Sequence, residues 1–174
     1  VSSIMRPSEE TSRVEVLQLS RCGLGERAAS SLGRMIEDTR SLKVLDLSWN
    51  VLGKRGAAAI GDGLRSASSL SHLLLAWTGI TDAGASHVAA ALKGNDSLVH
   101  LDLSGNTVSA DTCMVLLEAL SQNSTLKALV LRDNPLGVYA ARRLLQAVHD
   151  GVVAQVDLLG CSFSPIVAGD LRKM

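Results

Sequence analysis

With 174 residues, the chain is long enough to form one domain with a substantial hydrophobic core. Its 17 Lys and Arg balance its 17 Asp and Glu, which argues against non-specific binding to nucleic acids or anionic membranes, since both need a positive field. Hydrophobic residues form 47% of the chain but aromatic residues only 2%, so we expect a core of many similar Leu, Ala and Val layers, and no apolar run is long enough to span a bilayer.

The first segment of the chain, residues 1–13, is mostly polar and lacks the apolar stretch of a signal peptide. It fits none of the repeats that follow it. We therefore expect a non-repeat N-terminal flank over 1–13 and a repeat domain over 14–174.

From residue 14 onward, one eleven-residue pattern recurs at spacings of 28, 28, 28, 28 and 27 residues. Aliphatic residues occupy its first, fourth, sixth and last positions, except for Phe163 at the end of the last copy, and its ninth position is Asn, Thr or Cys. The copies are VEVLQLSRCGL (14–24), LKVLDLSWNVL (42–52), LSHLLLAWTGI (70–80), LVHLDLSGNTV (98–108), LKALVLRDNPL (126–136) and VAQVDLLGCSF (153–163).

Each copy predicts a short strand followed by a helix. The alternating LxL core is typical of a strand, and apolar residues four, eight and twelve positions past the pattern mark one helix face. These helical sites are Ala28–Leu32–Ile36, Gly56–Ile60–Leu64, Gly84–Val88–Leu92, Thr112–Leu116–Leu120 and Ala140–Leu144–Val148. The first site of each set is small, which predicts a close approach to the neighbouring turn. Val167 and Leu171 match the first two sites of a sixth helix.

The pattern L-x-x-L-x-L-x-x-N/C-x-L resembles the leucine-rich-repeat family over residues 14–174, and the repeat length with "G-x-x-G-A" helical halves is similar to its ribonuclease-inhibitor-like subfamily. The resemblance implies an α/β solenoid of about six repeats, starting near 14, 42, 70, 98, 126 and 153. Parallel strands lie about 4.8 Å apart while helices need about 10 Å. The solenoid should therefore curve, with parallel strands on its concave face and helices on its convex face.

The ninth-position side chains should satisfy turn amides that have no partner in the sheet, which makes Cys22 and Cys161 structural residues. The third, fifth, seventh and eighth positions should face outward, and their charged residues sum to −2. Trp49 and Trp77, the only two Trp residues, both occupy the eighth position. They should therefore stand side by side on the rim of the concave face. They either anchor a partner, shield the exit turns, or are tolerated variants of the Gly in "SGN".

The outward positions supply the candidate partner-binding residues. Their apolar side chains gather in the second and third repeats, and charged side chains lie around these. The candidate residues are Trp49, Trp77, His72, His100, Leu74, Asp46, Asp102, Arg132 and Asp133. His72 and His100 align near Asp102, yet a metal would need further ligands, so we expect no metal there and consider a pH-sensitive contact instead. No phosphate-binding loop, dinucleotide fingerprint or nucleophile elbow occurs, so we expect no cofactor and no catalytic residues.

These features predict a non-enzymatic scaffold that binds a protein partner through its concave face, and neither nucleic acid nor membrane. One alternative, by fold analogy alone, is an enzyme regulator similar to the GTPase-activating protein of Ran. Another is the ligand-sensing region of a larger nucleotide-binding, leucine-rich-repeat receptor. Three Cys in no paired spacing favour reduced thiols and a cytoplasmic setting. The chain also resembles ciliary and cytoskeletal repeat proteins, again by analogy of the fold alone.

Overall fold

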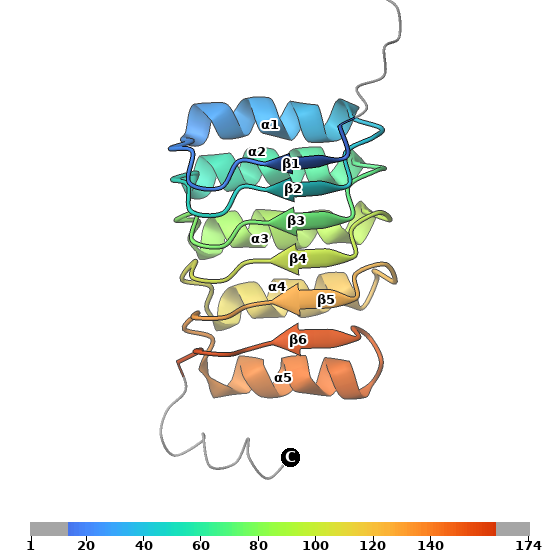
Figure 1. Ribbon diagram of the computed structural model, residues 1–174. Helices are drawn as coiled ribbons and strands as arrows, with labels where there is room; N and C mark the ends of the chain where they lie inside the picture. The colour runs from blue at the N-terminus through green and yellow to red at the C-terminus, as the bar shows by residue number, and fades with distance from the viewer. Residues whose placement is uncertain (1–13, 163–174) are drawn as a thin grey trace, which may run out of the picture.

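Six short parallel strands form one sheet in chain order in the computed structural model, which describes residues 14–162 (Figure 1). Third-position residues pair with one another across all six strands, as His72 does with His100, so the sheet register follows the repeat. The strands are β1 (Val16–Gln18), β2 (Val44–Asp46), β3 (His72–Leu74), β4 (His100–Asp102), β5 (Ala128–Val130) and β6 (Gln155–Asp157).

The helices cover one side of this sheet, and α1 extends beyond β1 at one end of the stack while α5 extends beyond β6 at the other (Figure 1). The helical layer is thus the longer one, and the strands lie on the inner, concave side. The helices are α1 (Glu26–Asp38), α2 (Gly53–Ser66), α3 (Asp82–Ala91) with the 3-10 turn η1 (Leu92–Gly94), α4 (Ala110–Leu120) and α5 (Gly137–His149). The predicted α/β solenoid is confirmed. The predicted flank over 1–13 and the predicted sixth helix, with Val167 and Leu171, lie outside the described residues.

The core consists of stacked layers of Leu. The fourth- and sixth-position side chains of the middle repeats, such as Leu73 and Leu75, are fully buried. In the first repeat, Leu17 and Leu19 are only half-buried, because no described layer covers them on the N-terminal side. For the same reason α1 buries Ala29, Gly33 and Ile36, whereas Ala28 and Leu32, which we predicted to face the core, stay partly exposed.

The first two helices pack against each other through backbone. A Cβ atom at Gly33 would collide with the carbonyl oxygen of Ala59, and one at Gly63 would collide with that of Gly33. The predicted close approach at helix starts is also present, since a Cβ at Gly56 would lie 2.8 Å from that of Ala29. Figure 1 accordingly shows α1 and α2 closer together than α4 and α5.

Asn106 joins two consecutive repeats at the point where the chain leaves the strand. Its Oδ1 accepts hydrogen bonds from the backbone N–H groups of Thr78 (3.0 Å) and Ile80 (3.3 Å). Its Nδ2 donates to the carbonyl oxygens of Leu75 (2.7 Å) and Leu103 (3.1 Å). One buried side chain therefore satisfies backbone groups of both its own repeat and the preceding one.

The same arrangement continues along the stack at the other ninth positions. Asn50 and Asn134 make equivalent bonds, Thr78 donates to the carbonyl of its own repeat at 2.7 Å, and the Sγ of Cys161 donates to that of the preceding repeat at 3.1 Å. The structural role predicted for Cys161 is thus confirmed. The prediction for Cys22 is wrong, because its thiol is exposed and reaches only a carbonyl within its own loop.

A second ladder, at the opposite edge of the sheet, was not predicted. Asn95 donates to the carbonyl of Leu64 at 2.7 Å and accepts from the backbone N–H of Leu98 at 2.7 Å. Asn123 repeats the pattern one repeat later and donates to the carbonyl of Asn95 at 2.8 Å. The 28-residue separation of these two Asn residues was the available signal, and it lies outside the eleven-residue pattern.

Replacing Asn106 by Ala should destabilise the whole stack, because buried backbone groups of two repeats would lose their partners. At about 1–3 kcal/mol for an unsatisfied buried group, we expect the free energy of unfolding to fall by about 3 kcal/mol or more in urea titrations. The control is Gln122→Ala, which removes an exposed amide. Equal stability of the two variants would contradict the ladder.

Candidate functional site

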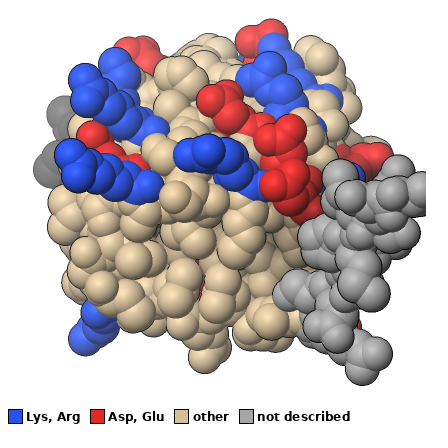
Figure 2. All heavy atoms as spheres, turned by 90° about the horizontal axis from the view of Figure 1, so that it is seen from above, with Lys and Arg blue, Asp and Glu red and all other residues tan. Residues whose placement is uncertain are grey.

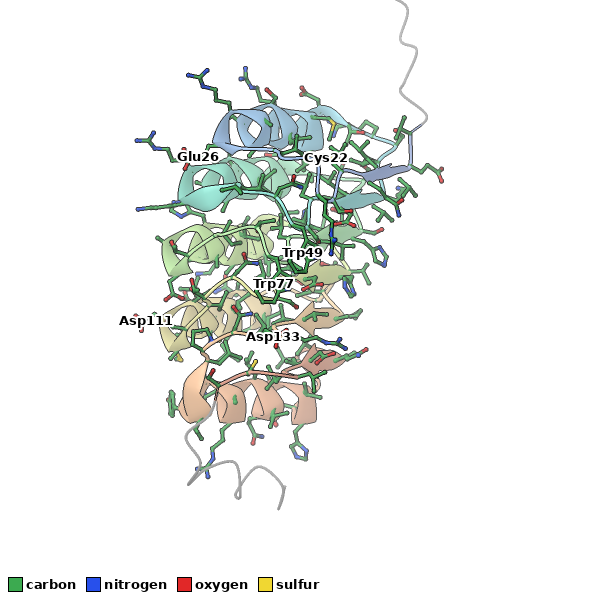
Figure 3. The ribbon with its side chains drawn as sticks, turned by 60° about the vertical axis from the view of Figure 1, so that its left-hand side comes forward. Cys22, Glu26, Trp49, Trp77, Asp111 and Asp133 are labelled. Carbon is green, nitrogen blue, oxygen red and sulfur yellow. The ribbon has the colours of Figure 1, made fainter. Side chains whose placement is uncertain are left out.

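The nine candidate residues lie on two adjoining surfaces. Side chains of β2, β3 and β4 form the strand face: Asp46, His72, Leu74, His100 and Asp102. The loops that lead from each strand to the following helix form what we call the loop edge, which carries Trp49, Trp77, Arg132 and Asp133. Figure 3 looks onto the loop edge, with both Trp residues and Asp133 labelled. The Trp residues thus occupy the predicted rim rather than the floor of the concave face.

The eighth position of every repeat has a left-handed backbone conformation. This region costs a residue with a Cβ about 1–2 kcal/mol, and Gly essentially nothing. The φ angles are 57° at Arg21, 60° at Trp49, 55° at Trp77, 64° at Gly105, 54° at Asp133 and 73° at Gly160. The chain therefore keeps two bulky Trp residues where Gly would be less strained.

The two Trp rings stack on each other, with centroids 5.1 Å apart and planes inclined by 15°. The guanidinium Cζ of Arg21 lies 4.8 Å from the Trp49 ring centroid on one side. On the other side the Trp77 ring lies directly on Gly105, where any Cβ would collide with it. We call Arg21, Trp49 and Trp77 the Trp column. Its ring faces are covered within the protein, yet Trp49 is 49% and Trp77 43% exposed, so the rings present their edges to solvent.

The predicted outward orientation of the seventh position is wrong in the middle repeats, where Ser48, Ala76 and Ser104 are buried. The backbone N–H of Ser48 donates to the Oδ1 of Asp46 at 2.9 Å, and that of Ser104 to the Oδ1 of Asp102 at 2.9 Å. Such Asp-capped turns end the strand, so inward–outward alternation stops there. Asp46 and Asp102 consequently shape the turns as well as charging the strand face.

Arg132 is engaged within the protein, whereas Asp133 faces solvent. A guanidinium nitrogen of Arg132 lies 2.6 Å from the Oδ2 of Asp157. Their hydrogen bond raises the pKa of Arg132 and lowers that of Asp157. The Asp133 carboxylate lies against Gly160 and has no ion pair among the described residues.

His72 and His100 also stack, with ring centroids 5.5 Å apart and planes inclined by 18°. The Nδ1 of His72 lies 2.9 Å from the hydroxyl of Ser71. Burial and the neighbouring His72 lower the pKa of His100, and the carboxylate of Asp102 partly opposes this. Within residues 14–162, no cluster of three or more His, Cys, Asp or Glu side chains could hold a metal.

The buried thiol of Cys113 is not a candidate nucleophile. Burial raises the pKa of the Cys113 thiol to about 12, so this thiol stays protonated and unreactive at neutral pH. No helix within 14–162 is long and apolar enough to cross a membrane.

Comparisons with known proteins agree with this architecture. The "Leucine Rich repeat" family model matches residues 40–61, 66–89, 94–116 and 122–138, and together with the six-stranded solenoid it shows that the chain is a leucine-rich-repeat protein. No curated protein matches the sequence.

Two solved structures are similar to the fold at low sequence identity. One is described as leiomodin-1 actin-binding site 2, with a TM-score of 0.69, 18% identity and coverage of 78% of this chain and 79% of that one. The other is the tropomodulin C-terminal domain of Caenorhabditis elegans, with a TM-score of 0.69, 13% identity and coverage of 80% and 84%. At such identities the likeness concerns the fold alone.

Replacing Gly105 by Ala should displace Trp77 from the column, because the added methyl group would occupy the position of the indole. The near-ultraviolet circular dichroism of this chain comes largely from two stacked Trp residues, and we expect that signal to weaken. Gly94→Ala is the control, since its Cβ would meet only ordinary contacts, 3.5 Å from the side chain of Arg65. An unchanged spectrum for Gly105→Ala would contradict the stacking.

Replacing His72 by Ala should raise the pKa of His100, because a neighbouring positive charge is lost, and Asp102→Asn should lower it. NMR titration of the imidazole protons measures both shifts. The pKa of His100 lies below its ordinary 6.5 in the folded state, so the unfolded chain binds this proton more readily. The free energy of unfolding of the wild type should therefore decrease as the pH falls below 6.5. Shifts of the opposite sign would contradict this electrostatic account.

Proposed function

We propose that this chain is a non-enzymatic scaffold that binds a protein partner through the loop edge and the adjoining strand face, with Trp49 and Trp77 as its anchor. The observation that carries the proposal is the exposed Trp stack at two left-handed backbone positions. A cytoplasmic setting is part of the proposal, and the free thiols of the three Cys residues are consistent with it.

The Trp stack has a structural cost and no structural necessity. The equivalent Gly105 shows that the turn forms without a side chain at this position. Each Trp instead adds about 1–2 kcal/mol of backbone strain and exposes apolar surface that favours non-specific association. Trp is among the residue types most enriched at interface hot spots, where truncation costs about 2 kcal/mol or more. Binding to a partner is the role that offsets these costs.

The geometry also favours tight binding, because the column is ordered in the free protein. Arg21 and Gly105 hold the two rings from either side, so less conformational entropy is lost on association. Viewed from the N-terminal end of the stack, charged side chains gather on the helical side and the strand side is largely uncharged (Figure 2). An aromatic anchor beside outward positions whose charges sum to −2 is suited to a protein partner rather than to nucleic acid.

The double variant Trp49→Gly/Trp77→Gly separates binding from folding, because Gly relieves the left-handed strain. We expect its stability in urea to stay close to that of the wild type, while partner affinity falls about thirtyfold or more, which corresponds to 2 kcal/mol. Quantitative pull-down from cytoplasmic extract measures captured proteins. Purified actin belongs in a direct binding assay, since the leiomodin-1 fragment is described as an actin-binding site.

Tyr139→Ala provides the matched control, because Tyr139 is an aromatic side chain that is 64% exposed on α5. It should retain every partner that the wild type captures. If the Gly double variant retained the same partners at equal affinity, the proposed anchor would be refuted.

A further inference from the structure

The loop edge has a charge polarity that restricts the chemistry of its partner. Building on the proposed function, we infer that the bound partner segment carries an apolar side chain for the Trp column and, about 10 Å further along the repeat axis, a Lys or Arg for Asp133. The spacing corresponds to two strand separations of about 4.8 Å each, from the third repeat to the fifth.

The apolar part of the loop edge lies in the second and third repeats. Val51 is 76% exposed and lies on the same loop as Trp49, next to the start of α2. We call the exposed side chains of Trp49, Val51 and Trp77 the apolar patch. Because the ring faces are already covered, a flat base or sugar cannot stack on them. Indole edges and a Val side chain instead suit an aliphatic or aromatic side chain of a protein.

The acidic part of the loop edge follows in the third to fifth repeats, with Asp82, Asp111 and Asp133 at loop or helix-start positions. Asp111 and Asp133 are exposed, and Figure 3 shows both on the side of Trp77 away from Trp49. Burial disfavours the charged form of Asp82, but hydrogen bonds from Ser109 and Thr112 outweigh this and lower its pKa. Its carboxylate therefore keeps its charge at neutral pH.

Few cations oppose these carboxylates on the described part of the edge. Arg132 lies there but is paired with Asp157. Lys93, in η1 at the far end of its repeat's helix, is paired with Glu118, and Lys127 precedes β5 at the opposite edge of the sheet. At the other end of the apolar patch, Arg21 is held over Trp49, and the exposed Lys54 and Arg55 begin α2, three and four residues after Val51. Glu26, at the start of α1, is a carboxylate at this end. The edge is therefore mainly basic in the first two repeats and acidic in the third to fifth.

A spacing of about 10 Å suits two kinds of protein segment. Residues seven apart on an α-helix are about 10.5 Å apart, and residues three apart on an extended chain are about 10 Å apart. Either segment would lie along the repeat axis with its basic end toward the fifth repeat.

Selection of a random peptide library on the wild-type domain, with counter-selection on Trp49→Gly/Trp77→Gly, tests this inference. Peptides that depend on the Trp column should be enriched in an apolar residue followed by Lys or Arg at one of these two spacings. Asp111→Asn/Asp133→Asn should weaken them about fivefold at low salt, and less at high salt. Asn tolerates the left-handed backbone of Asp133. Asp96→Asn, an exposed position before β4 at the opposite edge, should leave affinity unchanged.

The outcomes separate this inference from the proposed function. Trp-dependent peptides without basic enrichment, or with equal affinity for the Asp111→Asn/Asp133→Asn variant, would overturn the inferred polarity and leave the Trp anchor standing. A complete lack of Trp-dependent peptides would overturn both. If Asp96→Asn weakened binding of the basic peptides as strongly as Asp111→Asn/Asp133→Asn does, the inferred polarity would also be overturned. The effect would then come from overall charge.

Discussion

The buried side chain at the ninth position of the second to fifth repeats is the constraint on which the remaining structure depends. Each strand is only three residues long, so the chain turns back while its amides are still inside the protein. Unpaired buried amides are costly. Asn106 accepts from two amides of the preceding repeat and donates to carbonyl oxygens of both that repeat and its own. A repeat therefore completes its hydrogen bonds only against its neighbour, and the stack forms as one structure.

The same turn determines the candidate site. In the first five repeats the backbone N–H of the eighth residue donates to the seventh-position carbonyl oxygen of the next repeat, and every eighth residue adopts the same left-handed conformation. Side chains at that position consequently line up one strand separation apart. Two Trp residues in successive repeats must then stack, and Gly105 in the next repeat leaves the flat surface on which Trp77 rests. A strained turn and an exposed anchor arise from one backbone geometry.

The helical layer adjusts the shape of this surface. Gly33 and Gly63 let α1 and α2 approach through their backbones, whereas such contacts are absent between the described helices of the C-terminal half. The helices behind the Trp column are thus packed more closely than those of the C-terminal half.

Much of the fold and part of the site follow from the sequence. The 28-residue period assigns equivalent residues to equivalent layers, so the strands, their register, the ladder at Asn106 and the Trp49–Trp77 contact were predictable. Contacts that depend on the direction of a side chain were not predictable from the sequence. The burial of Ser104 results from an Asp-capped turn that ends strand alternation, and the engagement of Arg132 results from its reach to Asp157 on the next strand. Periodicity specifies which residues are neighbours, whereas only the packed stack decides which of them each side chain meets.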